Sequence, residues 1–165
     1  MPALSAGVTA PDFKLAAMDG KEFSLSEALK HGPVLLAFFK ISCPVCQFTL
    51  PYVERLYQAY RNASVTIVGV SQNNKKDTFR FNNEYGVTLP VLLDELDSYP
   101  VSNAYGLTNV PTLFWISSDG DIELSSVGWS RKDIEEINRR LGETATAKPA
   151  ILFRNGEVVP DFRAG

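Results

Sequence analysis

Two apolar runs separated by a helical period dominate the hydrophobic pattern of the first half of the chain. Residues 34–39 read Val-Leu-Leu-Ala-Phe-Phe and residues 65–70 read Val-Thr-Ile-Val-Gly-Val, which is typical of strands buried in a sheet. Between them, residues 44–61 place apolar side chains near one face of a helix that contains Pro51. The pattern therefore predicts a strand, a helix and a second strand, as in a parallel βαβ unit.

The rest of the chain continues the alternation of short strands and helices. Gly86 is expected to end one helix, and Phe79 is expected to anchor that helix in the core. Ser130 is expected to cap the last helix, with Asp133 in its first turn. The remaining predicted elements are a hairpin at 12–24, helices at 25–30, 75–85 and 130–141, an extended piece at 90–93, a helical turn at 98–105, and strands at 111–117 and 122–127.

These elements predict an α/β fold with a central mixed β-sheet flanked by helices. We expect a single domain over residues 1–165, with its core at about 8–141 and residues 142–165 as an appendage. Within the appendage, Asn155-Gly156 predicts a type I′ turn between two short strands at 151–154 and 157–159. The sheet would thus carry an N-terminal hairpin extension and a C-terminal hairpin.

Composition and charge exclude several classes of protein. The chain has 165 residues, of which 45% are hydrophobic, enough for one domain with its own core. A net charge of −3 argues against a nucleic-acid partner, and no apolar run is long enough to span a membrane. The first residues lack the basic and apolar regions of a signal peptide, so we expect a cytoplasmic protein. We also expect it to be a monomer. A periplasmic or secreted protein whose signal peptide is missing from the sequence is the alternative.

The only two cysteines, Cys43 and Cys46, stand three positions apart where a buried strand gives way to a helix. Cys43 is expected at the helix N-terminus, where unpaired backbone N–H groups and the helix dipole favour an anionic thiolate. Pro44 suits the first helical turn, because proline lacks the N–H that would be unpaired there. Cys46 is expected one turn further on, less exposed and able to form a disulfide with Cys43.

The pair allows three interpretations. A structural zinc site needs about four ligands, and the chain offers two thiols and one distant histidine, His31. Two inert cysteines in the core are the plain structural alternative. A redox-active dithiol accounts best for two thiols that flank a proline at a helix start. We therefore expect no metal and no organic cofactor beyond the Cys43–Cys46 disulfide itself.

The segment Cys43-Pro44-Val45-Cys46, with Pro51 in the same helix, resembles the thioredoxin superfamily. Val110-Pro111 resembles the cis-proline loop of that family. The chain also resembles peroxiredoxins and thiol–disulfide oxidoreductases of the TlpA and ResA type. The resemblance extends over about residues 8–141. The motifs that carry it are Ala10-Pro11-Asp12-Phe13, Val68-Gly69-Val70-Ser71 and Leu89-Pro90-Val91-Leu92-Leu93-Asp94.

The resemblance implies a thioredoxin fold and assigns roles to individual residues. Cys43 would be the nucleophile and Cys46 the resolving cysteine. Val110 and Pro111 would bind the substrate chain, with the Val110 backbone pairing with it. Candidate modulators of the dithiol are Lys40, Pro44 and Val45.

The sequence departs from the family pattern at three positions. Ser42 replaces the usual tryptophan, Ala37 the buried aspartate of thioredoxin, and Thr49 the glutamate of the ResA type. In the family those carboxylates are thought to move protons for the resolving cysteine, so general reductase activity is in doubt. Glu54 could substitute, although we expect it on a solvated helix face. Asp94 is expected in a solvated acidic loop together with Glu95 and Asp97.

From the residues and the resemblance together, we expect a thiol–disulfide oxidoreductase that reacts through a mixed disulfide. Its expected partners are protein or small-molecule disulfides and dithiols, together with an upstream thiol reductant. A peroxidase of the peroxiredoxin type is an alternative, but its Pro-x-x-x-Thr/Ser-x-x-Cys motif fits neither cysteine: the corresponding residues are Leu36 and Lys40, or Phe39 and Cys43. A non-enzymatic redox-sensing or partner-binding domain is the second alternative.

Overall fold

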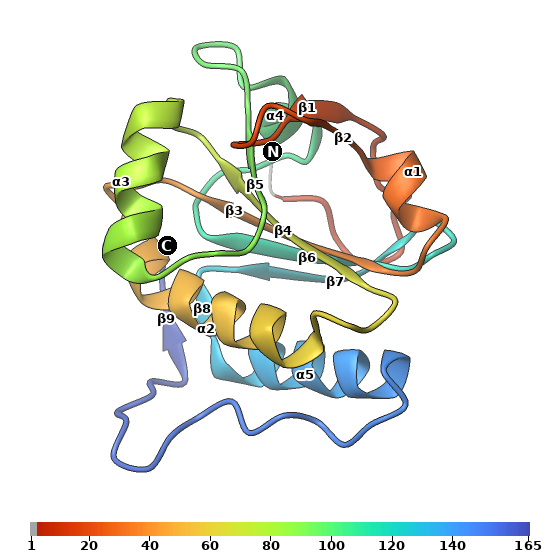
Figure 1. Ribbon diagram of the computed structural model, residues 1–165, viewed down its shortest axis with the longest axis vertical. Helices are drawn as coiled ribbons and strands as arrows, with labels where there is room; N and C mark the ends of the chain where they lie inside the picture. Colours follow the sequence, from red (N-terminus) through yellow and green to blue (C-terminus); the bar gives the residue numbers. More distant parts are fainter. Residues whose placement is uncertain (1–2) are drawn as a thin grey trace.

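The computed structural model describes residues 3–165, built around a five-stranded sheet (Figure 1). The strand order is β5-β4-β3-β6-β7, with β3, β4 and β5 parallel and β6 and β7 antiparallel to their neighbours. This is the mixed sheet that the sequence predicts. The five strands are β3 (Val34–Phe39), β4 (Thr66–Ser71), β5 (Val91–Leu93), β6 (Thr112–Ile116) and β7 (Ile122–Val127).

β3 occupies the centre of the sheet because all six of its residues are apolar and buried. Its side chains alternate between the two faces. Leu35, Ala37 and Phe39 pack into one core cluster, and Val34, Leu36 and Phe38 pack into the other. A strand that is apolar on both faces is stable only between two layers, and the surrounding helices provide those layers.

Different helices and strands cover the two faces of the sheet (Figure 1). In the first layer, three longer helices pack on the face of β3 that carries Leu35, Ala37 and Phe39. In the second layer, an N-terminal hairpin and two short helices cover the opposite face of β3. None of the helices within residues 3–165 is both long and apolar enough to cross a membrane. The elements of the first layer are α2 (Pro44–Tyr60), α3 (Lys75–Tyr85) and α5 (Arg131–Thr144), and those of the second are β1 (Lys14–Ala16), β2 (Glu22–Ser24), α1 (Leu25–Leu29) and α4 (Pro100–Ala104).

The predicted signals for helix ends are confirmed. Ser130 is the N-cap of α5, and its hydroxyl accepts a hydrogen bond from the Asp133 backbone N–H at 3.2 Å. Gly86 ends α3 in the left-handed conformation, with φ of 67°. Local chemistry therefore sets these helix boundaries.

The prediction that Phe79 anchors α3 in the core is wrong. Phe79 is 59% exposed, and Phe81 is the buried aromatic residue. The Phe81 ring lies 5.0 Å from the Phe39 ring, measured between centroids. Thr78 sets this rotation, because its buried hydroxyl pairs with that of Ser71 at 2.7 Å and turns Phe79 outward.

Glu54 is buried, contrary to the solvated position expected for it. Its carboxylate accepts hydrogen bonds from the backbone N–H groups of Thr88 and Leu89 at 2.7 and 2.9 Å, and from the Thr88 hydroxyl at 2.6 Å. These contacts tie α2 to the segment that leads into β5. A buried carboxylate is stable here because its oxygen atoms are hydrogen-bonded.

The C-terminal hairpin expected at 151–159 contains a turn but no strands. The turn is present, since Gly156 has φ of 83° and the Glu157 N–H donates to the Arg154 carbonyl. The flanking backbone bonds to side chains of α2 instead of a partner strand. The Arg55 guanidinium donates to the Leu152 carbonyl and the Glu157 carboxylate, and the Ala150 N–H donates to the Tyr60 hydroxyl.

Strand pairing occurs further along the tail. β9 (Phe162–Arg163) pairs antiparallel with β8 (Trp129–Ser130), outside the main sheet. The Trp129 indole N–H donates to the Pro160 carbonyl at 2.7 Å, and the Arg131 N–H donates to the Asp161 carbonyl. The appendage is therefore held against α2 and β8, with its last residues near the start of α2 (Figure 1).

The rotation of α3 predicts opposite outcomes for two neighbouring aromatic substitutions. Phe81→Ala should lower the free energy of unfolding by about 3–5 kcal/mol, because it leaves a cavity beside Phe39. Phe79→Ala should lower it by less than about 1 kcal/mol, because the ring is mainly exposed. Urea unfolding followed by circular dichroism measures both. Equal losses would contradict the assigned rotation.

Candidate active site

The two cysteines lie where β3 ends and α2 begins. Cys43 is the N-cap of α2, and Pro44 is its first helical residue, as expected. The Cys46 backbone N–H donates to the Cys43 sulfur at 3.1 Å. Negative charge on a sulfur in this position is stabilised by that N–H and by the positive end of the 17-residue helix.

The two thiols differ sharply in their environment. Cys43 is partly exposed, whereas Cys46 is fully buried, and both are free thiols in the structure. Burial raises the pKa of the Cys46 thiol far above its usual range, and the hydrogen bond with Cys43 raises it further. Cys46 is therefore a protonated thiol near neutral pH, and Cys43 is the sulfur accessible to a substrate.

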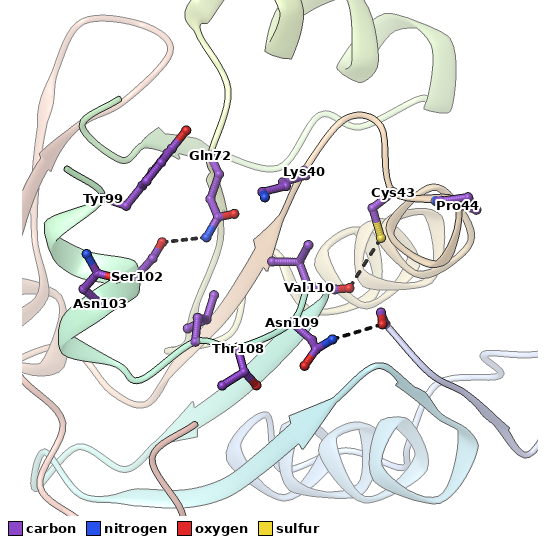
Figure 2. Close-up of a pocket in the computed structure, with 12 residues that line it drawn as sticks. Lys40, Cys43, Pro44, Gln72, Tyr99, Ser102, Asn103, Thr108, Asn109 and Val110 are labelled. Carbon is purple, nitrogen blue, oxygen red and sulfur yellow. Dashed lines mark hydrogen bonds between the residues drawn. The ribbon is translucent and has the colours of Figure 1, made fainter. Parts of the chain in front are cut away.

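The Val110–Pro111 loop lies directly against the cysteines. The peptide bond between Val110 and Pro111 is cis, which confirms the expected cis-proline loop. The Cys43 thiol donates to the Val110 carbonyl oxygen at 3.4 Å (Figure 2). Because β6 pairs with β3 in the register Phe38 opposite Thr112, the residues just before β6 lie beside those just after β3.

A pocket of about 490 Å³ opens beside Cys43. Of the residues singled out from the sequence, Lys40, Cys43, Pro44 and Val110 line it. Val45 faces the core instead, packed with the buried residues of the first layer. The other lining residues come from the end of β4, from α4 and the loops beside it, and from the tail: Gln72, Tyr99, Ser102, Asn103, Leu107, Thr108, Asn109 and Gly165.

The wall opposite Cys43 is fixed by a buried carboxylate. Asp94 is buried, which corrects the solvated position expected for it, whereas Glu95 and Asp97 are exposed as expected. The Asp94 carboxylate accepts hydrogen bonds from the Val101 and Ser102 backbone N–H groups at the start of α4, and from the Ser102 hydroxyl at 2.6 Å. The Gln72 amide then donates to the Ser102 hydroxyl oxygen at 2.9 Å. Asp94, Ser102 and Gln72 thus form one connected network, and two of its members, Ser102 and Gln72, line the pocket.

The tail supplies the last part of the wall. The Asn109 side-chain amide donates to the Gly165 carbonyl at 3.2 Å (Figure 2). Gly165 packs so closely against the Val110 carbonyl that a Cβ atom at position 165 would overlap its oxygen. Val110, whose backbone is expected to pair with a substrate, is therefore already in contact with the tail.

Some of these residues were accessible to sequence reasoning and some were not. Gln72 directly follows a strand parallel to β3, and sites form at the carboxyl ends of such strands. Tyr99 and Gly165 carry no motif, and only the three-dimensional structure places them here. Two of the positions at which the sequence departs from the family pattern are Ser42, which is exposed, and Thr49, which is buried. The Thr49 hydroxyl has no hydrogen-bond partner among residues 3–165.

Within residues 3–165, no group of three or more His, Cys, Asp or Glu side chains is placed to hold a metal ion. Thiol–disulfide exchange needs only the two sulfur atoms and a substrate disulfide or dithiol. Cys43 and Cys46 are the two cysteines of the chain that can supply those sulfur atoms.

The comparisons with known proteins agree with this geometry. The sequence profile of the AhpC/TSA family matches residues 6–125. The thiol-disulfide oxidoreductase ResA of Geobacillus thermodenitrificans is 34% identical over 140 residues, 84% of this chain and 78% of its own length. ResA of Halalkalibacterium halodurans is 32% identical over 134 residues, 80% of this chain and 74% of its own length.

A solved structure shows the same fold. The thioredoxin domain of the thiol-disulfide oxidoreductase BVU-2223 from Bacteroides vulgatus superposes with a TM-score of 0.73 at 23% identity, covering 84% of this chain and 98% of that one. The fold is thus that of thioredoxin, as the sequence predicts. The chain belongs to the AhpC/TSA family, among its thioredoxin-fold thiol–disulfide oxidoreductases of the ResA type.

Proposed function

We propose that the chain exchanges electrons with disulfide substrates through a mixed disulfide on Cys43, which Cys46 then resolves. The observation that carries the proposal is the contrast between the two thiols: one is accessible at the start of α2, and the other is fully buried one turn further on. An accessible sulfur attacks first, and a protected neighbour releases the product.

The exchange takes two steps. The Cys43 thiolate attacks one sulfur of the substrate disulfide, and the other substrate sulfur leaves as a thiolate. Cys46 loses its proton and attacks Cys43, which frees the second substrate thiol and forms the Cys43–Cys46 disulfide. Two electrons have then passed to the substrate, and an external thiol reductant must restore the dithiol. In reverse, the same steps oxidise a dithiol.

Deprotonation of Cys46 is the demanding step, since burial opposes the thiolate. The departing substrate thiolate is a base formed beside Cys43 in the first step, and it could accept the Cys46 proton. The buried carboxylate of Glu54 does not fit this role, because it is engaged with Thr88 and Leu89. The Val110 backbone and Pro111 would hold an extended substrate beside Cys43.

The direction of electron flow depends on the reduction potential of the pair. A potential near −270 mV, like that of thioredoxin, would make the protein a reductase, and one near −120 mV would make it an oxidant. Equilibration with glutathione buffers, quenched with acid and followed by mass spectrometry, measures this value. Pro44 and Val45, which lie between the two cysteines, stay predicted modulators of the potential.

Serine substitutions separate the roles of the two cysteines. Cys43→Ser should reduce the rate of insulin disulfide reduction to background, because no accessible thiol remains. Cys46→Ser should accumulate a one-to-one adduct with a disulfide substrate, detectable by mass spectrometry without reductant. Retained reduction by Cys43→Ser would contradict the assignment, as would rapid peroxide turnover with a thiol donor by the unmodified protein.

The burial of Cys46 predicts selective alkylation. At pH 7, iodoacetamide should modify Cys43 at least about tenfold faster than Cys46, because Cys46 is inaccessible and protonated. Because the pKa of Cys46 is raised, its rate of labelling should increase only when the pH is well above the pKa of ordinary thiols. Tandem mass spectrometry of the proteolytic peptide that holds both cysteines assigns the label to each and gives both rates, with urea-unfolded protein as the control. Equal rates in the folded protein would contradict the assigned environments.

A further inference from the structure

An apolar groove lies between the N-terminal half of α3 and the turn that joins β1 to β2. It has a volume of about 920 Å³ and is lined by Met18, Asp19, Lys75, Lys76, Phe79 and Arg80. A smaller hollow of about 370 Å³ shares Met18, Asp19 and Phe79 with it and continues toward β5. The exposed ring of Phe79 is therefore part of a groove and not an isolated apolar residue on the surface.

The charge around this groove is positive. The groove lining contains one carboxylate, that of Asp19, and three basic side chains, those of Lys75, Lys76 and Arg80. None of the ion pairs formed among residues 3–165 involves these three basic side chains. The other two acidic residues of α3, Asp77 and Glu84, are not part of the lining. A partner suited to the groove would therefore combine an apolar side chain with carboxylates.

The chain itself carries that combination in the loop that joins β5 to α4. Leu96 is 45% exposed there, and the exposed side chains of Glu95 and Asp97 flank it. We call residues 95–97 the acidic knob, because this loop projects from the body of the molecule (Figure 1). Within the described part of the chain, neither carboxylate of the knob forms an ion pair.

The acidic knob is held in one shape. The Tyr99 backbone N–H donates to the Glu95 carbonyl at 2.8 Å, which closes the loop. Asp97 and Tyr99 have left-handed backbone conformations, with φ of 71° and 42°, and such residues persist where their surroundings hold them. The buried Asp94 carboxylate provides that support, because it accepts hydrogen bonds from the Glu95 N–H and from the start of α4. A preformed loop loses little conformational freedom when it binds, so the knob is suited to docking.

We propose that two copies of the chain associate reversibly, with the acidic knob of one copy seated in the groove of the other. Leu96 would pack against Phe79, and the two carboxylates of the knob would face the three basic side chains of the groove. The knob and the groove both adjoin β5, the edge strand of the sheet, so one two-fold contact can satisfy both pairs at once. The inference is independent of the proposed function, and it departs from the monomer expected from the sequence.

Sedimentation velocity of the full chain at increasing protein concentration tests the association. A reductant is present throughout, so that no disulfide forms between copies. We expect a monomer–dimer equilibrium with a dissociation constant of about 0.1 mM, which is typical of a weak contact. A chain that stays monomeric up to about 1 mM would overturn the proposal.

Two charge-reversed variants test which surfaces meet. The groove variant carries Lys75→Glu and Lys76→Glu, which the first turn of a helix tolerates well. The knob variant carries Glu95→Lys and Asp97→Asn, because asparagine accepts a left-handed backbone. Each variant alone should be monomeric, since its knob and groove then carry like charges. An equimolar mixture should regain the association of the unmodified chain, because opposite charges meet again.

A matched control separates the contact from the effect of net charge. Lys132→Glu together with Lys148→Glu changes the net charge as much as the groove variant does, but on α5 and just after it. This control should associate like the unmodified chain. Association of either charge-reversed variant by itself would overturn the proposal, as would a mixture of the two that stays monomeric.

Phe79→Ala tests the apolar part of the contact. The folded chain should remain intact, because the ring is mainly exposed, and the association should weaken at least about tenfold. An unchanged dissociation constant would overturn the proposal. A chain that stays monomeric but binds a fluorescent peptide containing Glu-Leu-Asp, with binding lost in Phe79→Ala, would assign the groove to an acidic segment of another protein and overturn the second copy as its occupant.

Discussion

The pairing of β3 with β6 is the constraint on which the candidate site depends. One strand ends in the segment that carries the cysteines, and the other begins directly after the Val110–Pro111 loop. Because the two strands run antiparallel with Phe38 opposite Thr112, the end of one meets the beginning of the other. The contact between the Cys43 sulfur and the Val110 carbonyl joins residues 67 positions apart in the sequence, and it follows from this register. Both strands are buried on both faces, so a shift by one residue would move every side chain of a strand into the opposite core cluster. The packing of the two clusters therefore fixes the site geometry.

A second consequence of the fold is the asymmetry between the two sulfur atoms. Both belong to one helical turn and have the same chemistry. Cys43 stands at the rim where strand and loop meet, and Cys46 points into the core between the sheet and α2. The low polarity of that core favours a neutral thiol, whereas the helix terminus favours charge at the rim. The fold thus gives two identical side chains different tasks.

Much of this arrangement could be predicted because it is local. The apolar run of β3, the cap at Ser130, the stop at Gly86 and the two cysteines at a helix start all depend on neighbours in the sequence. The predictions that failed concern residues whose partners are distant or whose orientation is set by packing. Phe79 and Phe81 differ only in the rotation of α3, and that rotation depends on a hydroxyl pair with β4.

The burial of the Glu54 and Asp94 carboxylates could not be predicted either, because their hydrogen-bond donors belong to other elements of the fold. Acidic residues in a helix or a loop are usually solvated, and nothing in the neighbouring sequence shows that Glu54 will receive the N–H groups of Thr88 and Leu89. Asp94 likewise finds its donors at the start of α4. In the tail, the Asn155-Gly156 turn forms as its sequence indicates. The strands expected around it do not form, and the Leu152 carbonyl accepts a hydrogen bond from Arg55 of α2 instead of pairing with a second strand.

The docking of the tail against Val110 has a consequence for affinity. An extended polypeptide that used the Val110 carbonyl would meet Gly165, which already fills the space beside that oxygen. The two segments would then compete for one position, and the free energy that holds the tail in place would be subtracted from the binding of the polypeptide. That free energy comes from remote contacts, including the Arg55–Glu157 ion pair and the hydrogen bond from Trp129 to the Pro160 carbonyl. The strength of anchors far from the cysteines would therefore set how readily the cleft admits an extended chain.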